Sequence, residues 1–137
     1  MKIKLLIFFL FSAVACFSQN KIVVNIEEVP ASKGKVSVAI YENHDTFLKF
    51  DKVFASGTAE AVEGTTTIEV NEVPNGEYAI ALFYDENGND RLDTNWLGIP
   101  KEKVAFSNAK MRAFGPPKFK DCAFRVVNSD VALSISL

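Results

Sequence analysis

Oxygen-bearing side chains recur at odd-numbered positions in one short acidic segment of the sequence. With Asp85 as position 1, the residues Asp85, Asn87, Asn89 and Asp93 occupy positions 1, 3, 5 and 9. Ca²⁺ is a hard cation that takes about six to eight oxygen ligands, and this spacing lets one loop wrap around it. Residues 85–93 hold four acidic side chains and one Arg, a net charge of −3. The segment therefore predicts a candidate Ca²⁺ site.

The segment departs from an EF-hand loop at two positions. An EF-hand has Gly at position 6 and a bidentate Glu at position 12, where this sequence has Asp90 and Trp96. A Ca²⁺ site would therefore need a further oxygen from Asn95, Glu102 or solvent, and we expect any affinity to be weak, about 10⁻⁴–10⁻³ M. The alternative is an ordinary hairpin turn on the Asn87-Gly88 pair, without an ion.

Other catalytic chemistry finds little support in the sequence. The one histidine is His44, and no Cys/His spacing typical of zinc or Gly-rich phosphate loop is present. Cys122 lies in an alternating apolar stretch, so we expect a small buried hydrophobe rather than a nucleophile. The simplest enzymatic alternative is a hydrolase that uses Asp85 and Asp93 as paired carboxylates.

The segments around the acidic loop alternate apolar and small or polar residues with a period of two, which is typical of strands with one buried face. Residues 36–41, 78–84, 122–126 and 131–137 show this pattern most clearly, and residues 21–29 and 65–70 show it more weakly. Gly, Pro and Asn-rich turns separate the segments. About seven short strands in 137 residues predict one all-β domain, an antiparallel β-sandwich.

Less regular segments connect these strands. Residues 43–50 and 107–114 are expected to form helical turns, the second with Ser107 as N-cap. Residues 96–120 form a long connection whose aromatic side chains we expect to pack onto the sandwich, with a binding surface as the alternative. Residues 101–125 carry a net charge of +5. These cations either remain solvated, fold back onto the acidic body or meet an anionic partner such as a surface glycan.

The N-terminus reads as a secretory signal. Lys2 and Lys4 precede an apolar run that is too short to span a bilayer, and a polar exit follows. We predict a signal peptide over residues 1–18, a single domain over 19–137, and a periplasmic or extracellular location. Residues 13–16 also match a lipobox in part, so the alternative is a lipoprotein anchored to the membrane through Cys16. Nucleic acid is not expected as a partner, because the chain is exported and its net charge is −2.

Several motifs together resemble a bacterial family of unknown function, DUF2141. They are residues 73–89, Leu92-Asp93-Thr94-Asn95, residues 97–102, Phe106-Ser107-Asn108 and residues 115–119. The resemblance covers about residues 21–137. It implies an exported protein with an immunoglobulin-like or transthyretin-like sandwich, and it supplies no catalytic residues.

These observations favour an exported, non-enzymatic β-sandwich that acts as a binding or envelope accessory module. Its partner would be an envelope component or a glycan, and Ca²⁺ would organise the acidic loop. The alternatives are the carboxylate-dependent hydrolase and a purely structural envelope protein.

Overall fold

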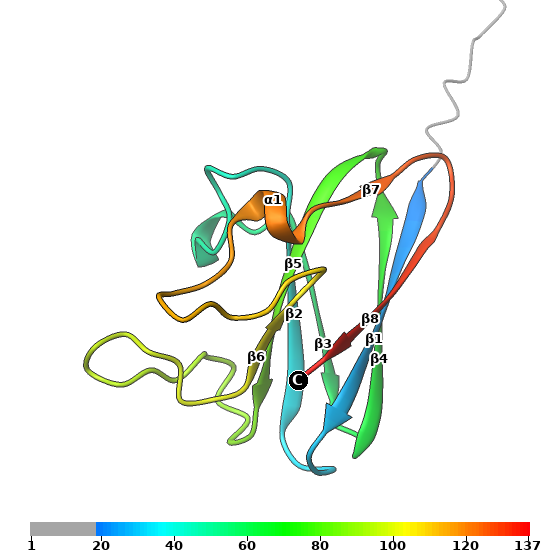
Figure 1. Ribbon diagram of the computed structural model, residues 1–137. Helices are drawn as coiled ribbons and strands as arrows, with labels where there is room; N and C mark the ends of the chain where they lie inside the picture. The colour runs from blue at the N-terminus through cyan, green and yellow to red at the C-terminus, as the bar shows by residue number, and fades with distance from the viewer. Residues whose placement is uncertain (1–18) are drawn as a thin grey trace, which may run out of the picture.

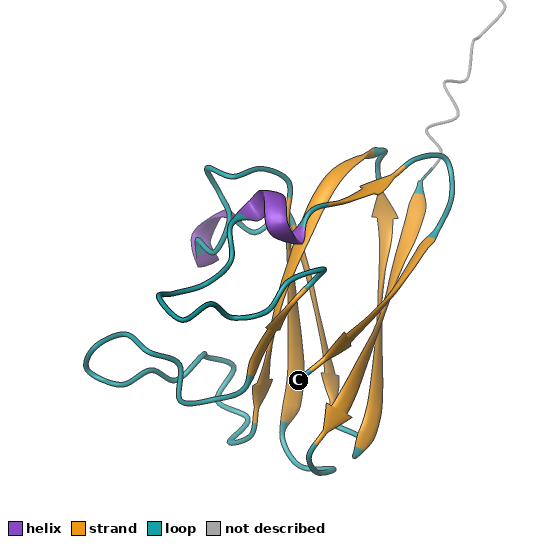
Figure 2. Ribbon diagram, viewed as in Figure 1, coloured by secondary structure: helices purple, strands orange, loops and turns teal. Residues whose placement is uncertain are grey.

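The computed structural model describes residues 19–137, so the predicted signal peptide and Cys16 lie outside the described residues. Two β-sheets pack face to face, which confirms the predicted all-β sandwich (Figures 1 and 2). One short helix, α1 (Phe119–Cys122), and one 3₁₀ turn, η1 (Phe50–Lys52), complete the fold. The strands are β1 (Asn20–Val29), β2 (Lys35–Tyr41), β3 (Ala55–Glu60), β4 (Gly64–Val73), β5 (Gly76–Asp85), β6 (Val104–Phe106), β7 (Phe124–Val126) and β8 (Val131–Ser136).

The smaller sheet has the order β4-β1-β8, and the larger has the order β3-β2-β5-β6. β7 pairs with residues 76–78 of β5, and β6 pairs with residues 81–83 of the same strand. Every pairing is antiparallel except that of β1 with β8, which runs in parallel from Ile22↔Val131 to Glu27↔Ser136. The predicted antiparallel arrangement therefore holds for all strand pairs but this one.

The core lies between the two sheets, and the period-two pattern explains which side chains fill it. Successive side chains of a strand point to opposite faces. In β2, Val36, Val38 and Ile40 are buried, whereas the intervening residues are only partly buried. The inward faces of β1 and β5 add the same kind of aliphatic and tyrosine side chains to this cluster. Turns at the predicted Gly, Pro and Asn positions separate the strands.

A second, smaller cluster lies outside this core and holds α1 in place. Phe119 and Cys122 of α1 pack with Tyr41 and Phe106, and Phe47 makes edge-on ring contacts with both Tyr41 and Phe119. The prediction that Cys122 is buried is confirmed. The prediction that a strand begins there is wrong, because Cys122 closes the helical turn and β7 begins at Phe124.

The expected helical turn at 107–114 is also wrong. Asn108 has a φ of 54°, which interrupts a right-handed helix. Ser107 does not cap a helix: its buried hydroxyl accepts a hydrogen bond from the Ile80 amide at 2.9 Å and donates one to the Cys122 carbonyl at 2.6 Å. The segment at 43–50 does form a turn, in which Phe47 N–H donates to the Asn43 carbonyl at 3.1 Å.

Three long connections, residues 42–54, 86–103 and 107–118, leave the larger sheet on the side away from the smaller one (Figure 1). The other connections between strands are short turns. In the described part of the chain, no helix has the length and apolar character needed to cross a membrane. The larger sheet therefore positions three irregular segments on one side of the molecule. Loops held by a rigid scaffold in this way often carry binding residues.

A candidate cation site in the acidic loop

The acidic loop begins where β5 ends, at a carboxylate that the fold buries completely. Asp85 has no exposed surface. Gly34, the residue before β2, approaches the Asp85 carbonyl so closely that a Cβ there would overlap it, and its φ of 72° is one that glycine adopts readily. The Tyr84 hydroxyl donates to the Lys33 carbonyl at 2.7 Å. The base of the loop is therefore fixed against the β1–β2 turn.

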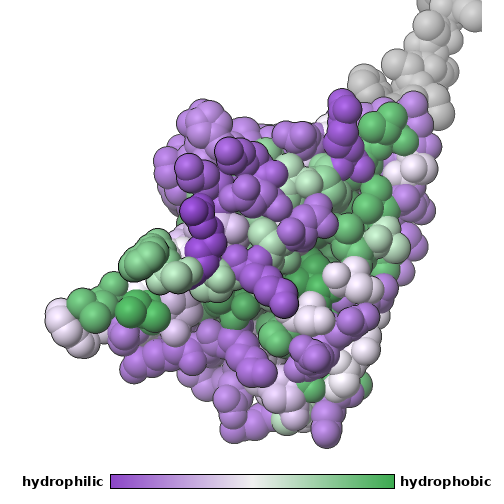
Figure 3. Space-filling view, viewed as in Figure 1, coloured by the Kyte–Doolittle hydropathy of each residue, from purple (hydrophilic) through white to green (hydrophobic). Residues whose placement is uncertain are grey.

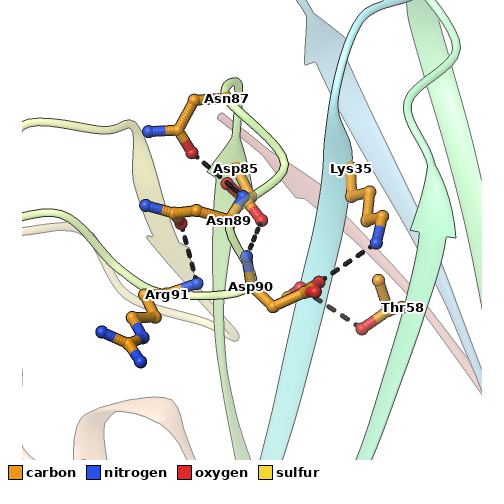
Figure 4. Close-up of polar contacts among 8 residues, drawn as sticks. Lys35, Thr58, Asp85, Asn87, Asn89, Asp90 and Arg91 are labelled. Carbon is orange, nitrogen blue, oxygen red and sulfur yellow. Dashed lines mark hydrogen bonds and ion pairs between the residues drawn. The ribbon is translucent and has the colours of Figure 1, made fainter.

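Side-chain oxygens at positions 1, 3 and 5 organise the loop backbone (Figure 4). Asp85 accepts hydrogen bonds from the Asn89 amide at 3.1 Å and from the Asp90 amide at 2.8 Å. The side-chain oxygen of Asn87 accepts from the Asn89 amide at 3.1 Å, and that of Asn89 accepts from the Arg91 amide at 3.0 Å. The bonds accepted by Asn87 and Asn89 span two residues and are Asx turns. Together with the longer-range bonds to Asp85, they fix the backbone of the loop.

Position 6 of the loop has the conformation that an EF-hand assigns to glycine. Asp90 has a φ of 61°, which an aspartate tolerates better than most residues. Its carboxylate forms an ion pair with Lys35 of β2 at 3.2 Å, and this contact raises the pKa of the lysine. Asp90 therefore adopts the backbone conformation needed at this position without glycine, and its side chain is anchored to the larger sheet.

Asp93 closes the loop. Its carboxylate accepts hydrogen bonds from the side-chain amide of Asn87 at 2.6 Å and from that of Asn89 at 3.0 Å. These bonds favour the charged form and lower the pKa of Asp93. The structure thus links all four residues that the spacing singled out, Asp85 through the backbone amide of Asn89 and the other three through their side chains.

Glu102 is the further carboxylate at this loop. Its Oε2 accepts a hydrogen bond from the Asp93 amide at 3.0 Å, and its Oε1 is the one buried side-chain oxygen or nitrogen in residues 19–137 without a partner. Burial, followed by the charges of Asp93 and Asp85, raises the pKa of Glu102, and the backbone amides of Asp93 and Glu86 oppose this shift in part. Asn95, the other residue proposed to complete the site, instead accepts hydrogen bonds from the amides of Leu97 and Ile99.

The geometry sets limits on what the loop can bind. Among the residues that the structure describes, no three Asp, Glu, His or Cys side chains are placed to hold a metal ion by themselves. A cation here would therefore draw on amide oxygens of Asn87 and Asn89 as well as on carboxylates. Carboxylate and amide oxygens have more than one lone pair, so an oxygen that accepts a hydrogen bond retains capacity for a cation.

A projecting hairpin extends directly from this loop. Its ends are joined where Lys101 N–H donates to the Asp93 carbonyl at 2.8 Å, and a β-bridge links Thr94 with Pro100. Trp96 at its tip is 90% exposed, and Phe114 on the neighbouring 107–118 connection is fully exposed. The expectation that the aromatics of residues 96–120 pack onto the sandwich is therefore wrong for these two, although Phe106 and Phe119 are buried.

The fold and this loop define a class: a small all-β sandwich whose larger sheet carries an acidic loop and two projecting connections. The comparison with protein families agrees with the motifs in the sequence. The family described as "Uncharacterized protein conserved in bacteria (DUF2141)" matches residues 24–134, and the chain belongs to this family. Searches against curated proteins and against solved structures found no match.

Proposed function

We propose that the protein is an exported, non-enzymatic binding module of the bacterial envelope, in which Ca²⁺ binds the acidic loop. The ligands would be oxygens of Asp85, Asn87, Asn89, Asp93 and Glu102. The observation that carries the proposal is the unpartnered, buried Oε1 of Glu102 beside this loop. Leaving a buried carboxylate oxygen without a partner is costly, and a cation coordinated by this oxygen would remove that cost.

The charges around the loop support the same assignment. Asp93 and Asp85 both raise the pKa of Glu102 through their negative charges. A divalent cation between them would replace like-charge repulsion with attraction and would favour ionised Glu102. The oxygen-only ligand set suits Ca²⁺ rather than zinc or copper.

The proposed role of the ion is to hold the projecting hairpin. Residues 94–100 are connected to the sandwich through Asp93 at one end and through Lys101 and Glu102 at the other. An ion coordinated by Asp93 and Glu102 would fix both ends at once. Binding loops that a rigid scaffold positions are the common arrangement in β-sandwich proteins.

Hydrogen bonding argues against the hydrolase alternative. A general acid or base needs a carboxylate that is free to exchange a proton with the substrate. Asp85 is buried and accepts two backbone amides, and the pKa of Asp93 is lowered by its two asparagine partners. We therefore propose a binding role for the loop rather than a catalytic one.

Calorimetry of the metal-free protein with Ca²⁺ tests the proposal. We expect saturable binding in the range of about 10⁻⁴–10⁻³ M, at least tenfold weaker in Asp93→Asn and in Glu102→Gln. The matched control is Glu86→Gln, which removes one charge from the same loop at a residue whose carboxylate pairs with Lys33 at 3.5 Å. Equal loss in the control would mean that only the net charge matters, and no heat in the wild type would refute the site.

Export is tested separately, by the mass of the mature N-terminus after expression in a bacterium. A chain beginning at Gln19 in the periplasm or medium supports plain secretion, and a lipid-modified Cys16 supports the anchored alternative. A full-length chain retained in the cytoplasm would contradict both.

A further inference from the structure

An apolar groove runs across the outer face of the larger sheet, beneath the three long connections. Its volume is about 650 Å³, which is within the usual range for sites of small organic ligands. The floor is formed by small side chains in one row across three strands, where Ser56 of β3 pairs with Ala39 of β2 and Ala39 pairs with Ala81 of β5. The groove exists because these side chains do not fill the space between taller walls.

The walls are mainly apolar and come from all three connections, and Asp90 and Arg112 are the charged residues of the lining. Phe50 comes from the 42–54 connection, Leu92 from the acidic loop, Ile99 from the projecting hairpin, and Met111 from the 107–118 connection. Phe50 is 69% exposed, and Ile99 and Met111 are also exposed. Apolar side chains gathered around a groove and left in water are typical of a surface that a ligand covers.

A basic pocket adjoins the groove. Lys110, Arg112, Lys118 and Lys120 line a cavity of about 400 Å³, with Asp121 as its one acidic residue. None of the four cations forms an ion pair with a carboxylate in residues 19–137. They therefore remain available to an anion. Arg112 lines both the pocket and the groove, so the two adjoin at this residue.

Figure 3 shows this combination on the molecular surface. Hydrophobic (green) side chains lie on the projecting hairpin and on the neighbouring 107–118 connection at the left, with near-white atoms at the far end of the lower projection, and hydrophilic (purple) side chains lie directly beside them. The figure and the two cavities place apolar and cationic surfaces next to each other on one side of the sandwich. A ligand that uses both must itself have an apolar part and an anionic part.

We propose that this groove binds an anionic amphiphile with a single linear apolar chain. The chain would lie in the groove, and the headgroup, a carboxylate, sulfonate or phosphate, would lie among Arg112, Lys118 and Lys120. This inference rests on the proposed role of the protein as a binding module and names its ligand class. An added peptide strand fits less well, because the floor strands β2 and β5 have paired neighbours on both sides and offer no free backbone edge.

Titration with linear alkyl sulfonates of 8, 10 and 12 carbons, below their micelle concentrations, tests this proposal. Calorimetry would give the affinities, and the emission of Trp96, the only tryptophan of the chain, would report on the hairpin that carries Ile99. Each methylene buried is expected to tighten binding up to about fourfold. Neutral alkyl maltosides of equal chain length are expected to bind at least tenfold more weakly.

Two variants locate the ligand. Ala81→Leu should abolish binding by filling the floor, and Arg112→Glu with Lys118→Glu should weaken it at least tenfold. The matched controls are Ala132→Leu on the exposed face of β8 and Arg125→Glu on β7, which should bind as the wild type does. Thermal unfolding verifies that Ala81→Leu folds, and the charge-reversal variant tests the proposal through exposed residues alone.

Several results would overturn the proposal. Undiminished binding in both groove variants, or equal affinity for neutral amphiphiles, would contradict it. Binding to vesicles of anionic phospholipid without binding to the monomeric sulfonates would also contradict it. That result would indicate that the projecting hairpin and the 107–118 connection dock on membranes. The titrations are made both in chelator and in about 1 mM Ca²⁺. If sulfonates bind but Ca²⁺ gives no heat, only the ion site is refuted. If Ca²⁺ binds but sulfonates do not, only the groove is refuted.

Discussion

Oε2 of Glu102 lies 3.0 Å from the backbone nitrogen of Asp93, whose N–H donates to it, while Oε1 of the same carboxylate is buried without a partner. The contact closes the segment between the two residues and places a carboxylate oxygen without a hydrogen bond beside the acidic loop. A cation coordinated by this oxygen would compensate its negative charge, as we propose for the acidic loop.

The first prediction concerns Glu102 and pH. Its pKa is raised in the folded protein, chiefly by burial, so the folded state holds its proton more tightly than the unfolded state does. This tighter proton binding stabilises the folded protein. The stabilisation is fully present below the unfolded pKa of Glu102, near 4.5, and is lost as pH rises through the folded pKa. Without Ca²⁺, Glu102→Gln should therefore be more stable than the wild type at neutral pH and nearly equal to it at about pH 4.

Urea unfolding in chelator at the two pH values measures this difference. Exposed Glu63→Gln is the control and should leave the pH dependence unchanged. Lower stability of Glu102→Gln at neutral pH would show that its charge is already compensated without an ion. The carboxylate of Asp93 has the opposite effect on the pH dependence of stability, because its pKa is lowered in the folded protein. Its contribution to folding stability is present above the unfolded pKa and is lost as pH falls through the folded pKa.

Gly34 should tolerate no side chain. In Gly34→Ala the new Cβ would overlap the Asp85 carbonyl and lie 2.7 Å from that of Glu86, at a φ of 72°. We expect a loss of about 3 kcal/mol in the free energy of unfolding. Gly64→Ala separates the two causes, because Gly64 also has a positive φ but has open space around it, and should lose about 1–2 kcal/mol. Equal losses would mean that contact with the loop is unimportant.

The hydroxyl of Ser107 should be a main support of the 107–118 connection. Ser107→Ala leaves the Ile80 amide and the Cys122 carbonyl without this partner in a buried site. We expect a loss of about 2–3 kcal/mol, measured by chemical unfolding. Ser129→Ala, whose hydroxyl bonds at an exposed turn, should change stability by less than about 0.5 kcal/mol. A Ser107→Ala protein as stable as this control would contradict the role of the hydroxyl.

Cys122 should be inert while the protein is folded. Its side chain is fully buried, and burial raises the pKa of the thiol to about 11. Since the thiolate is the reactive form, a disulfide reagent at about pH 8 should label the native protein far more slowly than it labels the same protein in concentrated urea. Rapid labelling of the native state would reopen the interpretation of Cys122 as a nucleophile.

The fold was predictable where apolar residues alternate and Gly, Pro or Asn mark the turns, as around Val36–Ile40 and Ile80–Tyr84. The pattern fails for β3, because its inward residues are Ala55, Gly57 and Ala59, which give little apolar contrast. It also fails at Cys122, where contacts with Tyr41 and Phe106 favour a helical turn over a longer strand. Both failures come from tertiary packing that a local pattern does not contain.

The candidate site was predictable in part, because Asp85, Asn87, Asn89 and Asp93 lie in one loop with regular spacing. Glu102 was one of three possible sources of a further oxygen, beside Asn95 and solvent. The sequence could not choose among them, because the hairpin between Asp93 and Glu102 returns Glu102 to the loop through backbone contacts that have no sequence signature. Nor could it predict that Asp90 would adopt a positive φ. The groove was beyond reach for a similar reason: its floor depends on strand register, which places Ser56, Ala39 and Ala81 in one row.

Residue-resolved nuclear magnetic resonance of the ¹⁵N-labelled, metal-free protein during titration with Ca²⁺ tests the proposed cation site. We expect saturable shifts at the backbone amides of residues 87–93 and 102 and at the side-chain amides of Asn87 and Asn89. We also expect the shifts to be lost in Glu102→Gln and retained in Glu86→Gln. No shifts at about 10 mM Ca²⁺, or shifts scattered over exposed acids elsewhere, would contradict it and would make the loop an ordinary turn.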